Sequence, residues 1–348
     1  MNNLIRDYNI HDVVSMRIVY AENLAKRLIG NTRVEYENFE VPSINEPDIT
    51  VRLGRFKGKK EGCRIQDNKY YVREGYLFCE DSYRGAKWKI ELNGLNTDKI
   101  ELNVSFNSIA SLSISGYVLD PLLNIILCRK GLSLVHASGA CNNGRAYLFT
   151  SQGGGGKTST ALSLTEKGFD FMGDNYMILD RGHALGFLSP LNVFSFNLLP
   201  SLKKSLGTRK SMEYQMKDSL HKAAGLRIVT KVNPKDVFRT KANRQKLKAV
   251  FQLVPREKTK IGPITIDDLC ERMTWNMRFD SLFFEKYLME YSYIFPESAL
   301  ASHWKVYCKN LMRNLGIDAN LYLVDVPKKY DQETFSEIYR KVEENGKA

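Results

Sequence analysis

The hydrophobic pattern changes along the first part of the chain. Residues 1 to about 30 space their apolar positions near the helical period, which predicts an N-terminal helix. From about 31 to 115, short stretches such as "YYVREGYLF" and "KIELNVSF" alternate apolar and polar residues, which is typical of antiparallel strands. In "DPLLNIILCRKG", Asp120 is a candidate N-cap, Pro121 fits the first helical position and Gly131 fits the stop, so a connecting helix is expected.

After Gly131 the pattern changes to strand, turn, strand, loop, helix and strand. "LSLVHASGA" and "RAYLFT" are apolar runs joined by "CNNG", which predicts a hairpin. A helix is expected from about Thr158 to Lys167, closed by Gly168, and "FDFMGDNYMILD" predicts one or two strands. "TIDDLCERMTWNM" and "SALASHWKVYCKNLMRNLG" predict further helices, followed by a strand "NLYLVDVP" and a terminal helix beginning at Asp331.

These patterns predict an α/β protein, α+β overall, in two domains. Residues 1–130 would form an N-terminal helix plus a β-rich domain, and residues 131–348 a nucleotide-binding domain. The length of 348 residues allows two domains, and the 43% hydrophobic and 26% charged content is that of ordinary globular proteins.

Targeting and redox signals point to the cytoplasm. No apolar run approaches the length of about 18 residues that spans a bilayer, and "MNNLIRDYNIHD" has no signal-peptide core. The six cysteines are scattered without a CxxC pair, which argues against zinc and a disulfide framework and fits reduced thiols. We therefore expect a cytoplasmic protein without a membrane span.

The net charge of +12 is concentrated in one segment. Residues 203–260 hold 17 Lys or Arg against 4 Asp or Glu. Such a segment can bind nucleic acid, an acidic membrane surface or a phosphorylated substrate. A solvated surface is the more common explanation, and no aromatic interleaving supports nucleic acid, which makes a nucleic-acid partner the weaker interpretation.

The stretch "AYLFTSQGGGGKTSTALSLTEKG", residues 146–168, contains a candidate phosphate-binding loop. Such a loop needs glycines that let backbone N–H groups approach phosphates, a helix N-terminus, a lysine for the outer phosphates and a hydroxyl for Mg²⁺. The matching residues are Gly153, Gly154, Gly155, Gly156, Lys157, Thr158 and the adjacent Ser159. The alternative is a flexible glycine-rich turn, but an apolar strand before the loop and a helix after it favour phosphate binding.

The strict pattern G-x-x-x-x-G-K-[ST] is not met, because residue 151 is Ser. If that position needs a left-handed backbone, Ser151 costs on the order of 1 kcal/mol. Gly153 or Gly154 would otherwise form the bend.

Chain geometry predicts which carboxylate lies near the loop. The helix carries the chain about 15 Å away, and the strand "FDFMG" returns roughly 16 Å. Asp174 should therefore lie beside Lys157, where a carboxylate can accept a hydroxyl proton or hold Mg²⁺. An ordinary turn Asp is the alternative. Asp180, at the end of "YMILD", is a second metal-binding candidate.

The predicted hairpin brings a histidine to the same place. Folding at "CNNG" pairs Ala140 with Arg145 and so sets His136 roughly opposite Thr150, near the mouth of the loop. A hydrogen-bonded strand histidine with no chemical role is the alternative.

Together these residues resemble the HPr kinase/phosphorylase family and its wider group of HPr kinase-like proteins. The similar stretch covers residues 134–179, with the order His, strand, Gly-Lys-Thr loop, helix, Gly and strand with Asp. The resemblance implies a P-loop core in which Lys157 contacts the β and γ phosphates and Thr158 helps to bind Mg²⁺. It also implies that Asp174 is the general base and His136 a nearby active-site residue.

The sequence departs from that family in two respects. HPr kinases commonly have two adjacent acids where this chain has Asp174 and Asn175, and the loop lacks its first glycine. The missing acid leaves the phosphorylase direction open, and no C-terminal segment matches those that handle HPr. The wider group has varied substrates, and some of its members phosphorylate serine in peptide-modification pathways. Phosphoenolpyruvate carboxykinase shares the loop type, but its further His and Lys pattern is missing.

The sequence thus predicts an ATP- and Mg²⁺-dependent kinase that transfers the γ-phosphoryl group to a hydroxyl of a peptide, a protein or a small molecule. The catalytic candidates are Asp174, His136 and Lys157, and the metal candidates are Thr158 and Asp174. Arg239 or Arg244 could supply a cation to the transferred group. The alternatives are a P-loop ATPase or nucleotide-gated switch, and a nucleic-acid-associated ATP-binding protein. The resemblance suggests a homo-oligomer.

Overall fold

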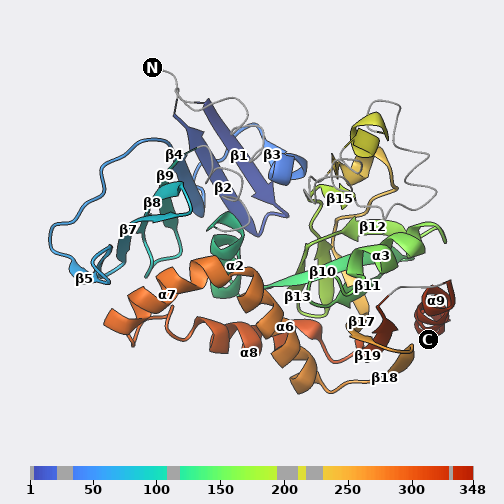
Figure 1. Cartoon of the computed structure of the whole chain (residues 1–348). Coiled ribbons are helices and arrows are strands. Elements are labelled where there is room, and N and C mark those ends of the chain that lie inside the picture. The colour runs from blue at the N-terminus through green and yellow to red at the C-terminus, as the bar shows by residue number, and fades with distance from the viewer. Residues whose placement is uncertain are drawn as a thin grey trace. The chain divides into compact units, whose positions relative to one another are not determined.

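The protein combines helices with many strands in mixed sheets (Figure 1). The computed structural model describes residues 4–21, 34–107, 118–193, 211–216, 230–328 and 332–347. The chain divides into two compact units, of which unit 1 comprises Met1–Ser133 and Met277–Asn310, and unit 2 comprises Leu134–Asn276 and Leu311–Ala348. Residues 277–310 were expected in the second domain, but they pack with unit 1.

Unit 1 is built on a nine-stranded sheet in the order β3-β1-β2-β4-β9-β8-β7-β6-β5. The strands are β1 (Leu4–Ile10), β2 (Val14–Tyr20), β3 (Glu40–Val41), β4 (Ile49–Leu53), β5 (Arg64–Gln66), β6 (Tyr70–Arg73), β7 (Tyr76–Tyr83), β8 (Ala86–Asn93) and β9 (Ile100–Phe106). A 3₁₀ turn, η1 (Glu37–Phe39), precedes β3. The predicted antiparallel strands are confirmed for β5 to β9, whereas β2, β4 and β9 pair in parallel.

The predicted N-terminal helix is wrong within the described residues. β1 and β2 form an antiparallel hairpin around His11 and Asp12, whose φ angles of 55° and 58° are left-handed. Buried and half-buried positions alternate strictly along Val14–Tyr20, which is the two-residue period of a strand. The β-branched residues of this run favour the strand, and the sheet supplies pairing that a local pattern does not reveal. Residues 22–33 of the expected helix lie outside the described residues.

Three of the helical segments that the structure describes contribute to unit 1. The predicted connecting helix is confirmed as α2 (Asp120–Arg129), with Pro121 in its first turn and Gly131 beyond its end at φ 79°. Its N-cap is Leu119 rather than Asp120, whose carboxylate instead accepts a hydrogen bond from the Tyr36 hydroxyl at 2.6 Å. The other two are α7 (Leu282–Ile294), which was not predicted, and the first part of α8 (His303–Leu315), which was.

Unit 2 contains an eight-stranded sheet. Its strands are β10 (Ser133–Asn142), β11 (Arg145–Thr150), β12 (Asp170–Gly173), β13 (Tyr176–Asp180), β14 (His183–Gly186), β17 (Gln245–Arg256), β18 (Lys260–Pro263) and β19 (Asn320–Pro327). The order is β11-β10-β13-β14-β17-β19-β18, with β12 on β10 and a further pairing of β11 with β17. β17 lies between β11 and β19 and is parallel to both. A separate pair, β15 (Leu191–Val193) and β16 (Thr230–Val232), is antiparallel.

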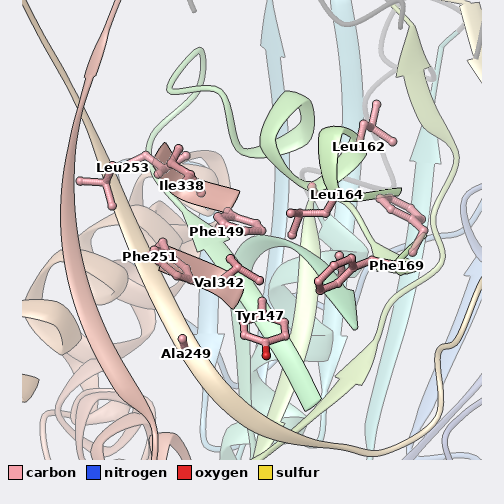
Figure 2. Packing of buried hydrophobic residues seen from close by; sticks show 14 of the residues in the cluster. Tyr147, Phe149, Leu162, Leu164, Phe169, Ala249, Phe251, Leu253, Ile338 and Val342 are labelled. Carbon is pink, nitrogen blue, oxygen red and sulfur yellow. The ribbon is translucent and has the colours of Figure 1, made fainter. Parts of the chain in front are cut away.

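Helices α3 (Lys157–Thr165) and α9 (Gln332–Lys347) contribute to the main core of unit 2. Figure 2 shows the rings of Tyr147, Phe149 and Phe251 in one cluster with Leu164 of α3 and Val342 of α9. Side chains alternate along a strand, so the residues of β11 and β17 that lie between these core residues face the other side of the sheet. The start expected for the terminal helix, Asp331, lies outside the described residues.

The remaining predicted helix is confirmed as α6 (Ile266–Asp280). No helix in the described part of the chain is long and apolar enough to cross a membrane.

Candidate functional site

The glycine loop connects β11 to α3, as the sequence predicts. Gly154 and Gly156 have φ angles of 81° and 83°, the left-handed region that glycine adopts without strain. Gly155 is required for space, because a Cβ there would lie 2.3 Å from Ser151 Oγ and 2.6 Å from Ser151 Cβ. Ser151 is not among the residues with positive φ, so Gly154 and Gly156 form the left-handed bends and Ser151 bears no such strain.

Lys157 is the first residue of α3, and its side chain is folded back onto the loop. Only 7% of the residue is exposed, and its Nζ donates to the carbonyl oxygens of Ser151 at 2.8 Å and Gln152 at 3.3 Å. The first turn of α3 contains no acidic residue of its own, so the helix itself does not offset its positive dipole end. The ammonium group and the helix N-terminus thus bring positive charge to the same place.

Asp174 lies at the start of α3, after β12 and before β13. Thr158 Oγ1 is 2.9 Å from Asp174 Oδ1 and 3.0 Å from Oδ2, and the Ser138 hydroxyl of β10 also donates to Oδ1. The residue is 3% exposed. Its carbonyl oxygen accepts from Ser189 Oγ at 3.0 Å, which fixes the backbone as well.

The turn around Asp174 depends on its two neighbours. Asn175 has a left-handed φ of 66°, and the Tyr176 N–H donates to the Asp174 carbonyl at 2.9 Å. A Cβ on Gly173 would lie 2.5 Å from the Phe187 carbonyl oxygen, so glycine permits this close approach. Asn175, at the position of the expected second acid, is therefore the residue that reverses the chain direction.

His136 lies near Asp174, and the predicted hairpin is confirmed as β10 and β11, with a register that differs from the predicted one by one to two residues. The turn has two residues, Asn143 and Gly144, both with positive φ, rather than four. Arg145 therefore pairs with Asn142 instead of Ala140, and Thr150 with Ala137 instead of His136.

The segments that carry His136 and Asp174 are joined through the backbone. Ala137 N–H donates to the Asn175 carbonyl at 3.2 Å, and the Thr150 hydroxyl donates to the His136 carbonyl at 2.9 Å. The His136 ring packs edge-on against Tyr176, with ring centroids 5.9 Å apart. His136 is thus close to the turn, with its ring against an aromatic neighbour.

Other sequence candidates have structural partners. Asp180 forms an ion pair with Arg244, and Arg239 forms one with Asp170. Asp180 is at the far end of β13, roughly 13 Å along the strand from Tyr176. These contacts do not bring Asp180, Arg239 or Arg244 to the glycine loop.

The basic segment 203–260 has two different parts. Residues 203–210 and 217–229 lie outside the described residues. Gln245–Arg256 is β17, a strand at the middle of the sheet, whose interior residues from Leu247 to Leu253 are mostly buried. Exposed Lys246 and half-buried Lys248 alternate with buried apolar residues there, so part of the charge is on the exposed positions of a structural strand.

The sequence interpretation missed three buried polar side chains near Thr150. Gln252 of β17 is in register with Thr150 and is 5% exposed. Its Nε2 donates to the Leu253 carbonyl at 3.3 Å, whereas its Oε1 has no hydrogen-bond partner among the described residues. Asn276 Nδ2 of α6 lies 3.5 Å from Thr150 Oγ1, and Ser138 bonds Asp174. For Gln252, the sequence signal that could have indicated a buried polar group is a single polar residue within an apolar run, "VFQLV".

The donor atoms at Asp174 suit a hard cation. A carboxylate and a hydroxyl supply the oxygen ligands that Mg²⁺ prefers, and Mg²⁺ is usually held by one or two carboxylates together with substrate phosphates. No group of three or more His, Cys, Asp or Glu residues suited to a metal occurs in the described part of the chain. Thr158 and Asp174 therefore fit Mg²⁺ that arrives with a nucleotide better than a resident metal.

Comparison with models of known protein families and with curated proteins finds no match to this chain. The functional argument therefore depends on the geometry around Lys157, Thr158 and Asp174.

Proposed function

We propose that the protein is an ATP- and Mg²⁺-dependent kinase of the HPr kinase-like type, with a P-loop core that transfers the γ-phosphoryl group to a hydroxyl. The acceptor would be a serine of a peptide or protein, or a small-molecule alcohol. The observation that carries this proposal is the contact of the Thr158 hydroxyl with both carboxylate oxygens of Asp174, directly after Lys157 at the N-terminus of α3.

The loop would hold the phosphates by charge and by backbone donors. Glycines 153–156 allow close approach of phosphate oxygens, and the α3 dipole favours negative charge there. Lys157 would exchange its two loop carbonyls for the β and γ phosphate oxygens, which are the stronger acceptors. Mg²⁺, bound with the nucleotide, would neutralise charge that develops on the transferred group.

Asp174 would accept the proton of the acceptor hydroxyl. The acceptor oxygen then forms a bond to the γ phosphorus, while the bond from that phosphorus to the bridging oxygen of the ADP leaving group breaks. Ser138 and Thr158 hold the carboxylate in one orientation, which is the positioning that phosphoryl transfer requires. His136, beside the turn that carries Asp174, would stabilise that turn or contact the acceptor.

Nucleotide hydrolysis is the second candidate, because water could take the place of the acceptor hydroxyl. The observation that favours it is the buried Gln252 amide, whose Oε1 has no partner among the described residues. A glutamine amide is a group that can orient water for attack on phosphate.

The test follows label from γ-labelled ATP and Mg²⁺ into protein, small-molecule and free-phosphate fractions of a lysate from the host. Lys157→Ala should abolish transfer, and Asp174→Asn should lower it by a factor on the order of 10² to 10⁴ with ATP binding retained. Lys167→Ala and Asp170→Asn, on the same helix-strand connection, are the matched controls and should keep wild-type activity.

Label in a protein or small molecule that disappears with Lys157→Ala would support the kinase and reveal its acceptor class. If the label that disappears with Lys157→Ala is found only in free phosphate, the kinase proposal would be replaced by nucleotide hydrolysis. An Asp174→Asn protein of wild-type activity would remove Asp174 from the role of base.

A further inference from the structure

The segment "RFKGKKEG", residues 55–62, carries four cations between β4 and β5 of unit 1. A buried polar network fixes its backbone. Lys59 N–H donates to the Tyr76 hydroxyl at 3.0 Å, and that hydroxyl lies 2.6 Å from the Lys59 carbonyl oxygen and 2.8 Å from Glu91 Oε1. Glu91 is 5% exposed, and its other oxygen accepts from Asn103 at 2.6 Å. The position of this loop is thus set by the core of unit 1.

Aromatic packing holds the same segment from a second side. A Cβ on Gly58 would lie 2.2 to 2.5 Å from atoms of the Phe78 ring, so the loop backbone lies directly against that ring. Phe56 packs edge-on against Phe78 with centroids 6.2 Å apart, and Lys60 Nζ lies 4.6 Å from the centre of the Tyr71 ring. The segment and the neighbouring strands line a hollow of about 740 Å³.

The lining of this hollow is strongly cationic. It contains five cations, Lys57, Lys59, Lys60, Arg73 and Lys89, and two carboxylates, Glu61 and Glu80, which gives a net charge of 5 − 2 = +3. Lys89 pairs with Glu80 at 2.9 Å. Among the described residues, the other four cations form no salt bridge with a carboxylate. Like charges held around one hollow repel one another, and an anionic ligand would relieve that repulsion.

We propose that this hollow, which we call the basic pocket (Phe56–Glu61, Arg73, Phe78, Glu80 and Lys89), binds an acidic segment of a polypeptide. The cations would pair with carboxylates, and the half-buried Phe56 ring would contact an apolar side chain of the same segment. Nucleic-acid binding depends on many phosphate contacts along a strand, whereas the cations here are confined to one hollow, so a short acidic peptide segment fits better than nucleic acid. The proposal stands apart from phosphoryl transfer, because every residue involved belongs to unit 1.

The test measures fluorescence anisotropy of a fluorescein-labelled peptide of alternating Glu and Leu against the full-length protein. A Lys-and-Leu peptide and an oligothymidylate of matched length serve as comparison probes. Lys57→Glu/Lys60→Glu reverses two charges of the basic pocket, and Lys87→Glu/Lys99→Glu makes the same change elsewhere on unit 1. Circular dichroism confirms that each variant is folded.

We expect the wild type to bind the acidic peptide, with affinity that falls as salt rises. The pocket variant should lose roughly tenfold or more, and the control variant should match the wild type. Equal binding by the pocket variant and the wild type would overturn the proposal, as would no binding of the acidic peptide by the wild type. If the wild type binds oligothymidylate more tightly than the acidic peptide and the pocket variant loses that preference, the proposed ligand would be nucleic acid instead of a peptide. The Lys157→Ala protein should bind the peptide normally, which separates this result from the kinase test.

Discussion

At the scale of single residues, the side chain of Ser151 explains why residue 155 is glycine. Ser151 occupies the position where the strict loop pattern has its first glycine, and its Cβ and Oγ fill the space that a side chain at 155 would need. The departure from the pattern is therefore accommodated inside the loop, by a glycine at a position where the pattern allows any residue.

We predict that Gly155→Ala destabilises the protein by about 2 kcal/mol, because overpacking in a tight site typically costs 1 to 3 kcal/mol. Gly153→Ala is the matched control, because its φ is not positive and a Cβ there meets nothing within 4 Å. Thermal or denaturant unfolding measures both. Ser151→Gly should restore most of the stability lost in Gly155→Ala, and a double variant no more stable than Gly155→Ala would contradict this explanation.

At the scale of elements, the candidate site is assembled by turns. The two-residue turn at Asn143 and Gly144 sets the register that places Ala137 beside Thr150. The left-handed Asn175 returns the chain after β12, which puts Asp174 against Thr158. One residue more or fewer in either turn would move the facing side chains to the opposite side of the sheet.

A buried histidine between helices makes unit 1 sensitive to acid. His303 of α8 is 5% exposed, and its Nε2 lies 3.4 Å from Asn124 Nδ2 of α2. Burial, with a smaller contribution from Arg129, lowers the pKa of His303 from 6.5 to about 4. Above pH 6.5 the ring is neutral in both states. As the pH falls below 6.5, only the unfolded state binds the proton, so stability is lost until the pH reaches about 4.

We predict that this histidine accounts for roughly 3 kcal/mol of stability lost between pH 7 and pH 4, the equivalent of its pKa difference. Denaturant unfolding over that range measures the loss. His303→Gln cannot titrate and should show a correspondingly smaller loss, although its stability at pH 7 will be lower. An unchanged acid dependence in His303→Gln would assign the loss to other groups.

At the scale of the whole molecule, unit 1 is assembled from two stretches of chain separated by most of unit 2. Helix α7 is part of its structure. Trp88 Nε1 donates to the Tyr287 hydroxyl at 2.9 Å, and the Tyr291 hydroxyl accepts from Gly75 N–H at 2.9 Å and donates to Asn96 at 2.6 Å.

We predict that a fragment of residues 1–133 does not fold cooperatively, because it lacks the helices that cover these groups. The same fragment joined through a Gly/Ser linker to residues 277–310 should fold. Circular dichroism during thermal unfolding and resistance to protease measure both. A cooperative transition of the short fragment alone would show that residues 277–310 are dispensable.

The sequence by itself determined features that depend on neighbouring residues. The glycine loop between a strand and a helix, the helix α2 and the return of Asp174 toward the start of α3 all follow from local signals and short chain lengths. Periodicity failed where the final partner is distant in the chain. Val14 and Ile18, four residues apart, fit either period until the sheet pairs them. Strand β17 was not predicted, because its lysines were interpreted as part of a charged segment.

Only the tertiary structure decided which residues meet across the sheet. The tertiary structure brings the Ser138 hydroxyl into a hydrogen bond with Asp174 and pairs Gln252 with Thr150 across two strands. It also includes residues 277–310 in unit 1. The physical reason is that strand pairing and burial stabilise the fold more than local propensity does, and both depend on distant partners, such as β11 and β17, which are about a hundred residues apart. Turn length is a local feature with a tertiary effect, because one residue more or fewer in a hairpin turn changes every residue pair along the two strands.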